Sequence, residues 1–388
     1  MISTLLLVLA IRWWIDDASL PYLRAALAAL VYCAWHLRRS SSTRAKVFWI
    51  NAGVVTLVLA GVELFLWRTA ETPGGFDPDA DPSSGYISHA DYGYGPISPS
   101  RTRALKVHEG EKLYDVVYSI DEYGLRVSPP ERAASERRGC VLLVGCSLTF
   151  GEWVEDDETM PWQVGVKTDG RFATRNLGFQ GWGPHQMLAA LESGHAERAA
   201  RCDVTHVVYQ ALYWHALRSA GRVHWDRNGP RYLLDDAGRA VRAGHFTDAG
   251  PSSWLSRGTL DRLGRSYVFQ KYLASRLDPL ARPVTQRDLD LLAAIIARSR
   301  EEVATRFPRA SFHVFFWDID LAPSWIQDFE SRVARPGVTL HRVSAAIPDY
   351  RAPKDARYVL SSYDLHPSPA AHARIADYVV REVLHDAP

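Results

Sequence analysis

A long apolar run near the N-terminus constrains this chain more than any other feature of its sequence. Val47–Trp67 reads VFWINAGVVTLVLAGVELFLW, and only Asn51, Thr56 and Glu63 interrupt its apolar character. At 1.5 Å per residue a helix of this length measures about 31 Å, close to the roughly 30 Å thickness of the hydrocarbon core of a bilayer. A globular protein would need a second apolar shell to bury such a helix, so the run predicts a membrane span.

Two further apolar stretches precede this span. Leu20–Leu37 is a second candidate, with Arg24 near its start. Met1–Ile15 is shorter and contains Arg12, and no small-residue cleavage site of a signal peptide follows it. We therefore expect two to three transmembrane helices within residues 1–70, with Met1–Ile15 as a short span or as a re-entrant or interfacial helix.

Charges in the connections between these stretches predict their orientation. Four basic residues occupy the connection 36–46, whereas two acids occupy the preceding one: Arg38, Arg39, Arg44 and Lys46 against Asp16 and Asp17. Because Lys and Arg favour the cytoplasmic side, the chain after Trp67 is expected to be extracytoplasmic. Asn51 and Glu63 are costly in lipid, so we expect them to face a neighbouring helix.

Residues 71–138 have the composition of a linker with a short β segment. Glu71–Pro99 is rich in Pro, Gly, Asp and Ser and has no sustained period, and Arg126–Arg138 resembles a second tether. Between them, the alternation in Leu113–Tyr118 predicts a strand.

From residue 139 to 388 predicted strands alternate with predicted helices, which indicates an α/β domain with a mainly parallel sheet. Thr285 is a plausible N-cap for the long helix Leu289–Phe307. Trp225–Asp261 departs from this alternation and is expected to be an insertion containing a hairpin that turns at Asp236–Gly238. The expected strands are Val141–Gly145, the stretch ATRNLGFQG, Asp203–Leu212, Phe312–Trp317 and Val338–Val343, and the other expected helices are His185–Ala200 and Ala370–Leu384.

Two local patterns in this domain carry chemistry. Ser147 follows a buried strand and a Gly, at the point where a helix should begin, which exposes a hydroxyl beside backbone N–H groups. Near the C-terminus Asp364 and His366 lie two residues apart on a Pro-containing loop, where an aspartate can orient an imidazole. Alone, Ser147 reads as a helix N-cap and His366 as a structural surface residue, but the strand–Gly–x–Ser and Asp–x–His–Pro pair favours a catalytic triad.

At these residues the chain resembles the SGNH (GDSL-like) hydrolases, over about Tyr118–Leu384. GCSLTFGEWVEDDETMPWQV is similar to the nucleophile block of that family, NLGFQGWG to its second block, and DLHPSPAAH to its last. YSIDEYGLR resembles a segment that precedes the nucleophile in membrane-anchored members. The resemblance implies a three-layer α/β/α sandwich that hydrolyses or transfers ester-linked acyl groups without metal or cofactor. It also implies Ser147 as nucleophile, His366 as general base and Asp364 as its orienter, with backbone N–H groups of Ser147 and Gly181 forming an oxyanion hole.

The chain departs from the family pattern at two positions. Cys146 stands where the family usually has an Asp that supports the nucleophile loop. Trp214 stands where the family has the Asn of the oxyanion hole, and loss of one such donor costs about 10²–10³ in rate. His215 and Arg218 resemble a His-x-x-Arg pattern of some anchored relatives and are candidates for substrate binding together with Trp214. The alternative is that a helix begins here and packs on the sheet.

The remaining composition excludes several classes of function. Lys and Arg number 45 against 44 Asp and Glu, a balance that argues against a nucleic-acid partner. The histidines show no zinc spacing, and the acidic stretch Glu152–Glu158 is expected to be a solvated loop. Four Cys cannot form a disulfide framework, and Cys140 and Cys146 lie too far apart along one strand to pair, whereas Cys140 with Cys202 stays open.

These observations predict a membrane-anchored, extracytoplasmic serine esterase of SGNH type, acting on acylated glycans or lipids of the cell envelope. An O-acetyltransferase for an envelope polysaccharide shares the same chemistry and is the first alternative. A non-catalytic binding or scaffold protein with the same fold is the second, and Trp214 is the residue that favours it.

Overall fold

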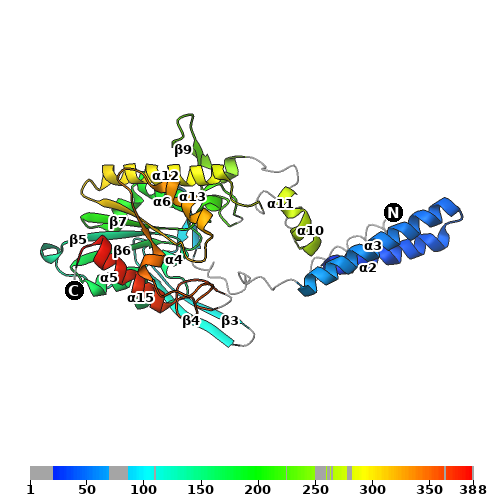
Figure 1. Cartoon of the computed structure of the whole chain (residues 1–388), viewed down its shortest axis with the longest axis horizontal. Helices are drawn as coiled ribbons and strands as arrows, with labels where there is room; N and C mark the ends of the chain where they lie inside the picture. Colours follow the sequence, from blue (N-terminus) through cyan, green and yellow to red (C-terminus); the bar gives the residue numbers. More distant parts are fainter. Residues whose placement is uncertain are drawn as a thin grey trace. The chain divides into compact units, whose positions relative to one another are not determined.

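The computed structural model describes residues 21–69, 86–108, 111–223, 225–249, 265–277, 282–361 and 364–386, together with residues 259 and 263. The chain forms two compact units (Figure 1). One unit combines Met1–Gly75 with Gly250–Pro283, and the other combines Phe76–Ala249 with Val284–Pro388. The predicted helix Met1–Ile15 lies outside the described residues.

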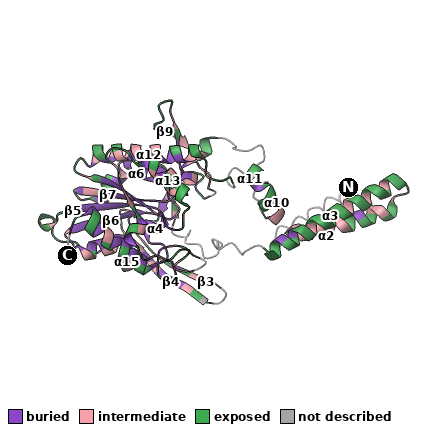
Figure 2. Cartoon of the chain, viewed as in Figure 1, coloured by how far each residue is buried: buried purple, intermediate pink, exposed green. Residues whose placement is uncertain are grey.

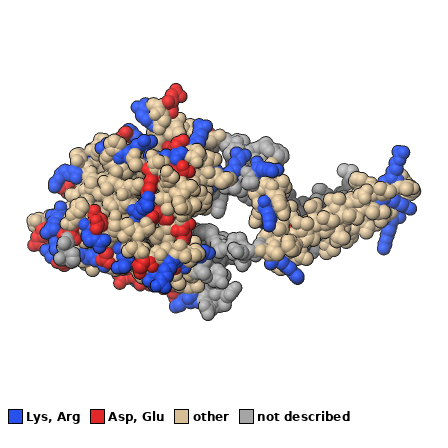
Figure 3. All heavy atoms as spheres, in the orientation of Figure 1, with Lys and Arg blue, Asp and Glu red and all other residues tan. Residues whose placement is uncertain are grey.

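The first unit contains a pair of packed helices, α2 (Pro21–Arg39) and α3 (Thr43–Thr69). Among the described helices only α3, with 27 residues, is long and apolar enough to cross a membrane. Figure 3 shows few charged side chains along this pair, apart from the basic ones gathered around the α2–α3 turn. The predicted second span corresponds to α2, but its 19 residues include Arg24, Arg38 and Arg39, so it does not meet the same criterion.

Glu63 of α3 is buried against a second segment of this unit. Its carboxylate accepts hydrogen bonds from the Ser266 hydroxyl at 3.0 Å and from the N–H groups of Tyr267 and Val268 at 2.7 and 3.0 Å. These donors open α10 (Tyr267–Tyr272), which is followed by α11 (Ala274–Leu277). Glu63 therefore faces another helix, as expected, whereas Asn51 is exposed.

The second unit is built on a five-stranded parallel sheet with the order β11-β10-β7-β5-β6. All five strands predicted from the sequence are present, which confirms the α/β prediction. Their bounds are β5 Gly139–Gly145, β6 Phe172–Gly178, β7 Val204–Ala211, β10 Ser311–Phe316 and β11 Thr339–Arg342.

Helices cover both faces of this sheet (Figure 1), and most residues of its strands are buried (Figure 2), except in the edge strand β11, where none is. Leu142 and Val144 of β5 point into one apolar cluster, and Val141 and Leu143 into the other. The first cluster is completed by α6 (Pro184–Glu192), α12 (Gln286–Arg306) and α13 (Pro323–Val333), and the second by α5 (Met160–Lys167) and α15 (Pro369–Tyr378).

One predicted helix begins as expected, and another differs from its predicted form. The Thr285 side chain caps α12 in a capping box with Asp288, as expected. The predicted helix His185–Ala200 is two helices, because Gly194 adopts a left-handed φ of +72° between them. The remaining short helices are α4 Ser147–Phe150, α7 His195–Ala200, α8 His215–Ser219, α14 Val343–Ala346, the π-helical turn Val379–Val383 and the 3₁₀ turns Ala134–Glu136, Asp156–Glu158 and Phe246–Ala249.

Part of the predicted linker is folded onto this unit. Two antiparallel hairpins pair β1 (Tyr86–His89) with β2 (Gly93–Pro96) and β3 (Ser100–His108) with β4 (Glu111–Ile120). Tyr92 and Tyr118 are buried in the core. The second predicted tether begins at Arg126, which is 1% exposed and donates to the carbonyl oxygens of Phe150, Gly151 and Val154.

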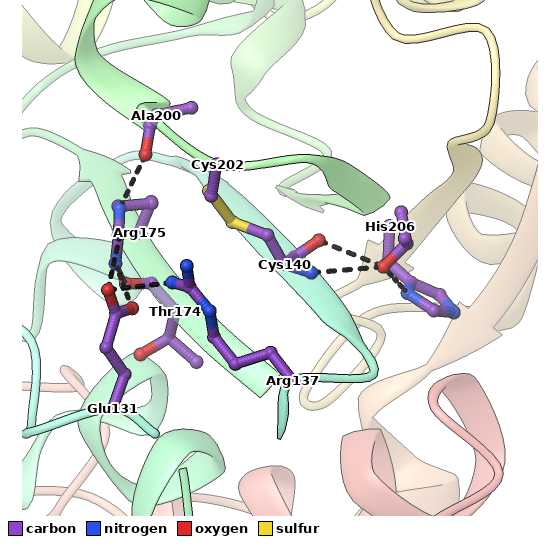
Figure 4. The surroundings of a disulfide bond; sticks show 9 residues. Glu131, Arg137, Cys140, Thr174, Arg175, Ala200, Cys202 and His206 are labelled. Atoms are coloured by element: carbon purple, nitrogen blue, oxygen red, sulfur yellow. Dashed lines mark hydrogen bonds and ion pairs between the residues drawn. A yellow bond between two sulfur atoms is a disulfide. The ribbon is translucent and has the colours of Figure 1, made fainter. Parts of the chain in front are cut away.

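The predicted hairpin of the insertion is confirmed as β8 (Pro230–Leu234) paired with β9 (Ala240–His245). A disulfide joins Cys140, at the start of β5, to Cys202, just before β7 (Figure 4). It therefore lies at the amino end of the sheet. Cys146 and Cys33 are free and buried.

Candidate active site

Ser147 is held at the carboxyl end of β5, an inner strand that lies between β7 and β6. The strand ends at Gly145, Cys146 is the N-cap residue, and Ser147 is the first residue of α4. A Cβ atom on Gly145 would lie 2.2 Å from the Thr149 hydroxyl, so this tight strand-to-helix turn requires glycine. The side chain of Ser147 is thereby fixed at the edge where the ends of parallel strands meet.

Asp364 and His366 lie on the loop that leads into α15. The Ser368 side chain caps this helix, and the His366 carbonyl accepts from the N–H of Leu360 at 3.0 Å. The Asp364 carboxylate also accepts from the backbone N–H of His366 at 3.1 Å. The loop is thus fixed at both its ends, and the imidazole is held in one orientation.

The structure brings these three residues into one hydrogen-bonded series. His366 Nε2 lies 3.0 Å from Ser147 Oγ, and His366 Nδ1 lies 2.6 Å from Asp364 Oδ1. The other carboxylate oxygen of Asp364 is 3.3 Å from Lys106 Nζ of β3. The 3.0 Å between Ser147 Oγ and His366 Nε2 falls within the range that proton transfer between a hydroxyl and a base requires.

The electrostatics of this series favour a charged pair. Burial raises the pKa of Asp364, but hydrogen bonds and the charges of His366 and Lys106 outweigh it and lower that pKa well below its usual value. Burial lowers the pKa of His366, but hydrogen bonds to Asp364 and Glu152 outweigh it and raise that pKa to about 10.

Glu152 is a functional-site residue that the sequence analysis missed. The predicted solvated loop is wrong for this side chain, which is 7% exposed. One oxygen lies 3.3 Å from His366 Nε2, and the other accepts from Gln180 Nε2 at 3.0 Å. In a run of five acids within seven residues, no sequence signal distinguishes the one that turns inward.

Gly181 follows β6 at the same edge of the sheet. Its φ is +73°, and a Cβ atom would lie 2.6 Å from the Tyr94 hydroxyl and 2.7 Å from Trp225 Nε1. Glycine is therefore required both by the backbone and by close packing. The hydroxyl of Tyr94 donates to the carbonyl of Gln180 at 2.9 Å, which fixes this loop from the β1–β2 hairpin.

The three residues after β7 have different surroundings. Trp214 is 44% exposed and packs edge-on against Trp325 at 5.3 Å between ring centres. His215 is fully buried and lies 2.6 Å from the Tyr209 hydroxyl, surroundings that suit the packing alternative better than direct contact with a substrate. Arg218 donates to the carbonyl of Trp182 at 2.5 Å, and so supports the loop that contains Gly181.

Within the described residues, no group of three or more His, Cys, Asp or Glu side chains could hold a metal ion. The side chains that meet at this site are one hydroxyl, one imidazole and two carboxylates, so a hydroxyl lies beside a group that can accept its proton.

No family model matches this chain, and no curated protein matches it. Solved structures do. A putative lipolytic protein of the G-D-S-L family from Desulfitobacterium hafniense is 11% identical, over 63% of this chain and 99% of that one, with a TM-score of 0.35. An acetyl xylan esterase from Butyrivibrio proteoclasticus is 10% identical over 64% of each chain, with a TM-score of 0.32. A family two carbohydrate esterase from Clostridium thermocellum, in complex with cellohexaose, is 10% identical over 67% of each chain, also with a TM-score of 0.32.

Proposed function

We propose that this protein is a membrane-anchored serine esterase of SGNH type that acts on ester-linked acyl groups. The observation that carries the proposal is the series Ser147–His366–Asp364, with 3.0 and 2.6 Å between successive atoms. A serine hydroxyl is inert at neutral pH unless a base removes its proton, and this arrangement supplies that base and a carboxylate to orient it.

The geometry supports a two-step reaction. Ser147 Oγ attacks the acyl carbon while its proton passes to His366 Nε2, and His366 then protonates the leaving alcohol. Water, deprotonated by His366, releases the acyl group and regenerates the serine. The N–H groups of Ser147 and Gly181 are the proposed donors to the oxyanion, because they close the turns after β5 and β6 at the same edge of the sheet.

An acylated glycan of the cell envelope is the substrate class we favour. Trp214 and Trp325 expose 44% and 37% of their surface, and Tyr213 stacks on Trp325 at 5.1 Å. Exposed aromatic rings at the carboxyl edge of the sheet suit the apolar face of a sugar ring. Anchoring by α3 and the disulfide Cys140–Cys202, a bond that persists in oxidising compartments, support an extracytoplasmic location.

Labelling by a serine-directed fluorophosphonate tests this function without knowledge of the substrate. We expect the probe to modify Ser147 in the full chain, as located by mass spectrometry of the labelled peptide. Ser147→Ala protein that keeps its thermal unfolding temperature is the control and should not be labelled. A folded wild-type protein that resists the probe between pH 6 and pH 10.5 would favour the non-catalytic reading.

A further inference from the structure

The proposed base has two neighbours at the same nitrogen. His366 Nε2 lies 3.0 Å from Ser147 Oγ and 3.3 Å from Glu152 Oε2. On the opposite side of the ring, Nδ1 lies 2.6 Å from Asp364. Both ring nitrogens therefore face a carboxylate, and both carboxylate side chains are less than one-tenth exposed.

This arrangement determines where the protons of the ring lie. Nδ1 donates to Asp364, so a neutral ring would direct the lone pair of Nε2 at the Glu152 oxygen, which is repulsive. A proton between Nε2 and Oε2 removes the repulsion and makes a charge-assisted hydrogen bond. The same proton occupies the lone pair that must accept the hydrogen of Ser147.

Backbone and side-chain hydrogen bonds hold Glu152 in this position. Its N–H donates to the Ser147 carbonyl at 2.9 Å, just after the left-handed turn at Gly151. Its second carboxylate oxygen accepts from Gln180, whose own side-chain oxygen accepts from the Tyr86 hydroxyl at 2.6 Å.

We propose that Glu152 is a positioning residue that holds a proton on His366 Nε2 and thereby sets the pH above which Ser147 becomes nucleophilic. This inference rests on the proposed function, since it concerns the same base and nucleophile. It makes the enzyme an alkaline one, with little activated serine at neutral pH.

Other charged groups near His366 and Glu152 either favour or oppose the imidazolium. On the loop itself Asp364 favours the imidazolium, whereas Lys106 of β3, which is paired with Asp364, opposes it. His372 of α15 interacts electrostatically with His366 and with buried Arg126, and Tyr118 of β4 interacts with Glu152. The raised pKa of His366, about 10, reflects the dominance of the two carboxylates over burial. Removing Glu152 leaves only one of them.

The test is the rate of fluorophosphonate labelling of Ser147 as a function of pH, in the full chain. Wild-type labelling should rise with pH and reach half its maximum above about pH 9. In Glu152→Gln and Glu152→Met the midpoint should fall by at least one pH unit, so that labelling at pH 7 becomes about tenfold faster or more. The Met variant is needed because, unlike Gln, Met has no side-chain N–H that could donate a hydrogen bond to Nε2.

Asp157→Asn is the matched control, because it removes one negative charge from an exposed position of the same segment. It should leave the midpoint within about 0.3 pH unit of wild type. Equal midpoints in wild type and both Glu152 variants would overturn the role of Glu152 while leaving the esterase proposal intact.

A second measurement covers the case in which the variants do not fold or the serine does not react. In wild-type protein labelled with ¹⁵N-histidine, the His366 nitrogens should keep the chemical shifts of an imidazolium up to about pH 9. A titration of His366 near pH 6.5, the value of an unperturbed histidine, would refute the proposal whatever the reactivity of Ser147.

Discussion

His366 is the residue on which the proposed chemistry depends, because it contacts both Ser147 and Asp364. Ser147→Ala and His366→Ala should each abolish ester turnover, and Asp364→Asn should lose up to about 10⁴ by favouring the wrong tautomer. Because the three groups act as a unit, Ser147→Ala/His366→Ala should be scarcely worse than either single change. The measurement is kcat on a small acyl ester, with thermal unfolding as the check on folding. Near-normal hydrolysis by Ser147→Ala would contradict the assignment.

Substitution of Trp214 tests whether its indole replaces the Asn of the oxyanion hole or contacts the substrate. If the indole stands in for the oxyanion Asn, Trp214→Asn should maintain or raise kcat on a small acyl ester. If the exposed indole instead contacts the substrate, the same change should raise KM with little effect on kcat. The packing of Trp214 on Trp325 makes a third outcome informative, since a large loss of folded protein would indicate a core role.

Ser147, Asp364 and His366 could be predicted because each lies in a short local pattern. A buried strand followed by Gly-x-Ser, and an Asp two residues before a His, are visible without any tertiary information. Glu152 could not be predicted, because its role arises only when α4 and the loop before α15 come together. The burial of His215 could not be predicted either, because it depends on the packing of α8, which its own sequence does not reveal.

At the scale of elements, strands buried on both faces were the most predictable. β5 contains a continuous apolar run, and β7 and β10 are mostly apolar. Such segments have few alternatives in a domain where helices alternate with them. β1 and β2 could not be predicted, because β1 has only four residues and β2, GYGP, has the Gly and Pro typical of a linker. Their stability comes from aromatic contacts with distant residues, such as Tyr86 against Phe179 at 5.3 Å.

Glu63 is expected to hold α10 against α3. In Glu63→Ala the first-turn donors of α10 lose their buried acceptor, at a cost of about 1–3 kcal/mol. Limited proteolysis between β9 and α12 should then be at least about tenfold faster, because local opening governs cleavage. Asn51→Ala, a change at an exposed position of the same helix, should leave the cleavage rate unaltered. Equal cleavage in the two variants would show that apolar contacts alone hold α10.

At the scale of the molecule, buried histidines make the fold sensitive to acid. Burial lowers the pKa of His313 and of His372 to about 3, and that of His195 to about 4. Below pH 6.5 the unfolded chain therefore binds protons that the folded chain excludes, and stability falls as the pH drops toward 4. For His313 and His372 the slope is at most about 1.4 kcal/mol per pH unit each.

Thermal unfolding of the full chain in detergent between pH 7 and pH 4.5 measures this effect. His366 does not contribute to this acid window, because its raised pKa places its own loss of stability between pH 6.5 and about pH 10. His313→Gln should reduce the dependence of stability on pH in this acid range by the contribution of one histidine. An unfolding temperature that is constant across the acid range would contradict the burial of these neutral imidazoles.

The charges of the α2–α3 turn predict the orientation of the chain in a membrane. Arg38 and Arg39 end α2, and Arg44 and Lys46 begin α3, so the turn carries four positive charges and no acid. The positive-inside rule places this turn in the cytoplasm and the chain after Trp67 on the other side of the membrane. An alkaline phosphatase reporter, which needs oxidising conditions, should be active when fused after Trp67 and inactive when fused near Ser42. The disulfide Cys140–Cys202 gives a second readout, since extracytoplasmic protein should contain no alkylatable thiol at either position before reduction. Reversed reporter activities together with free thiols would place the domain in the cytoplasm and rule out an envelope substrate.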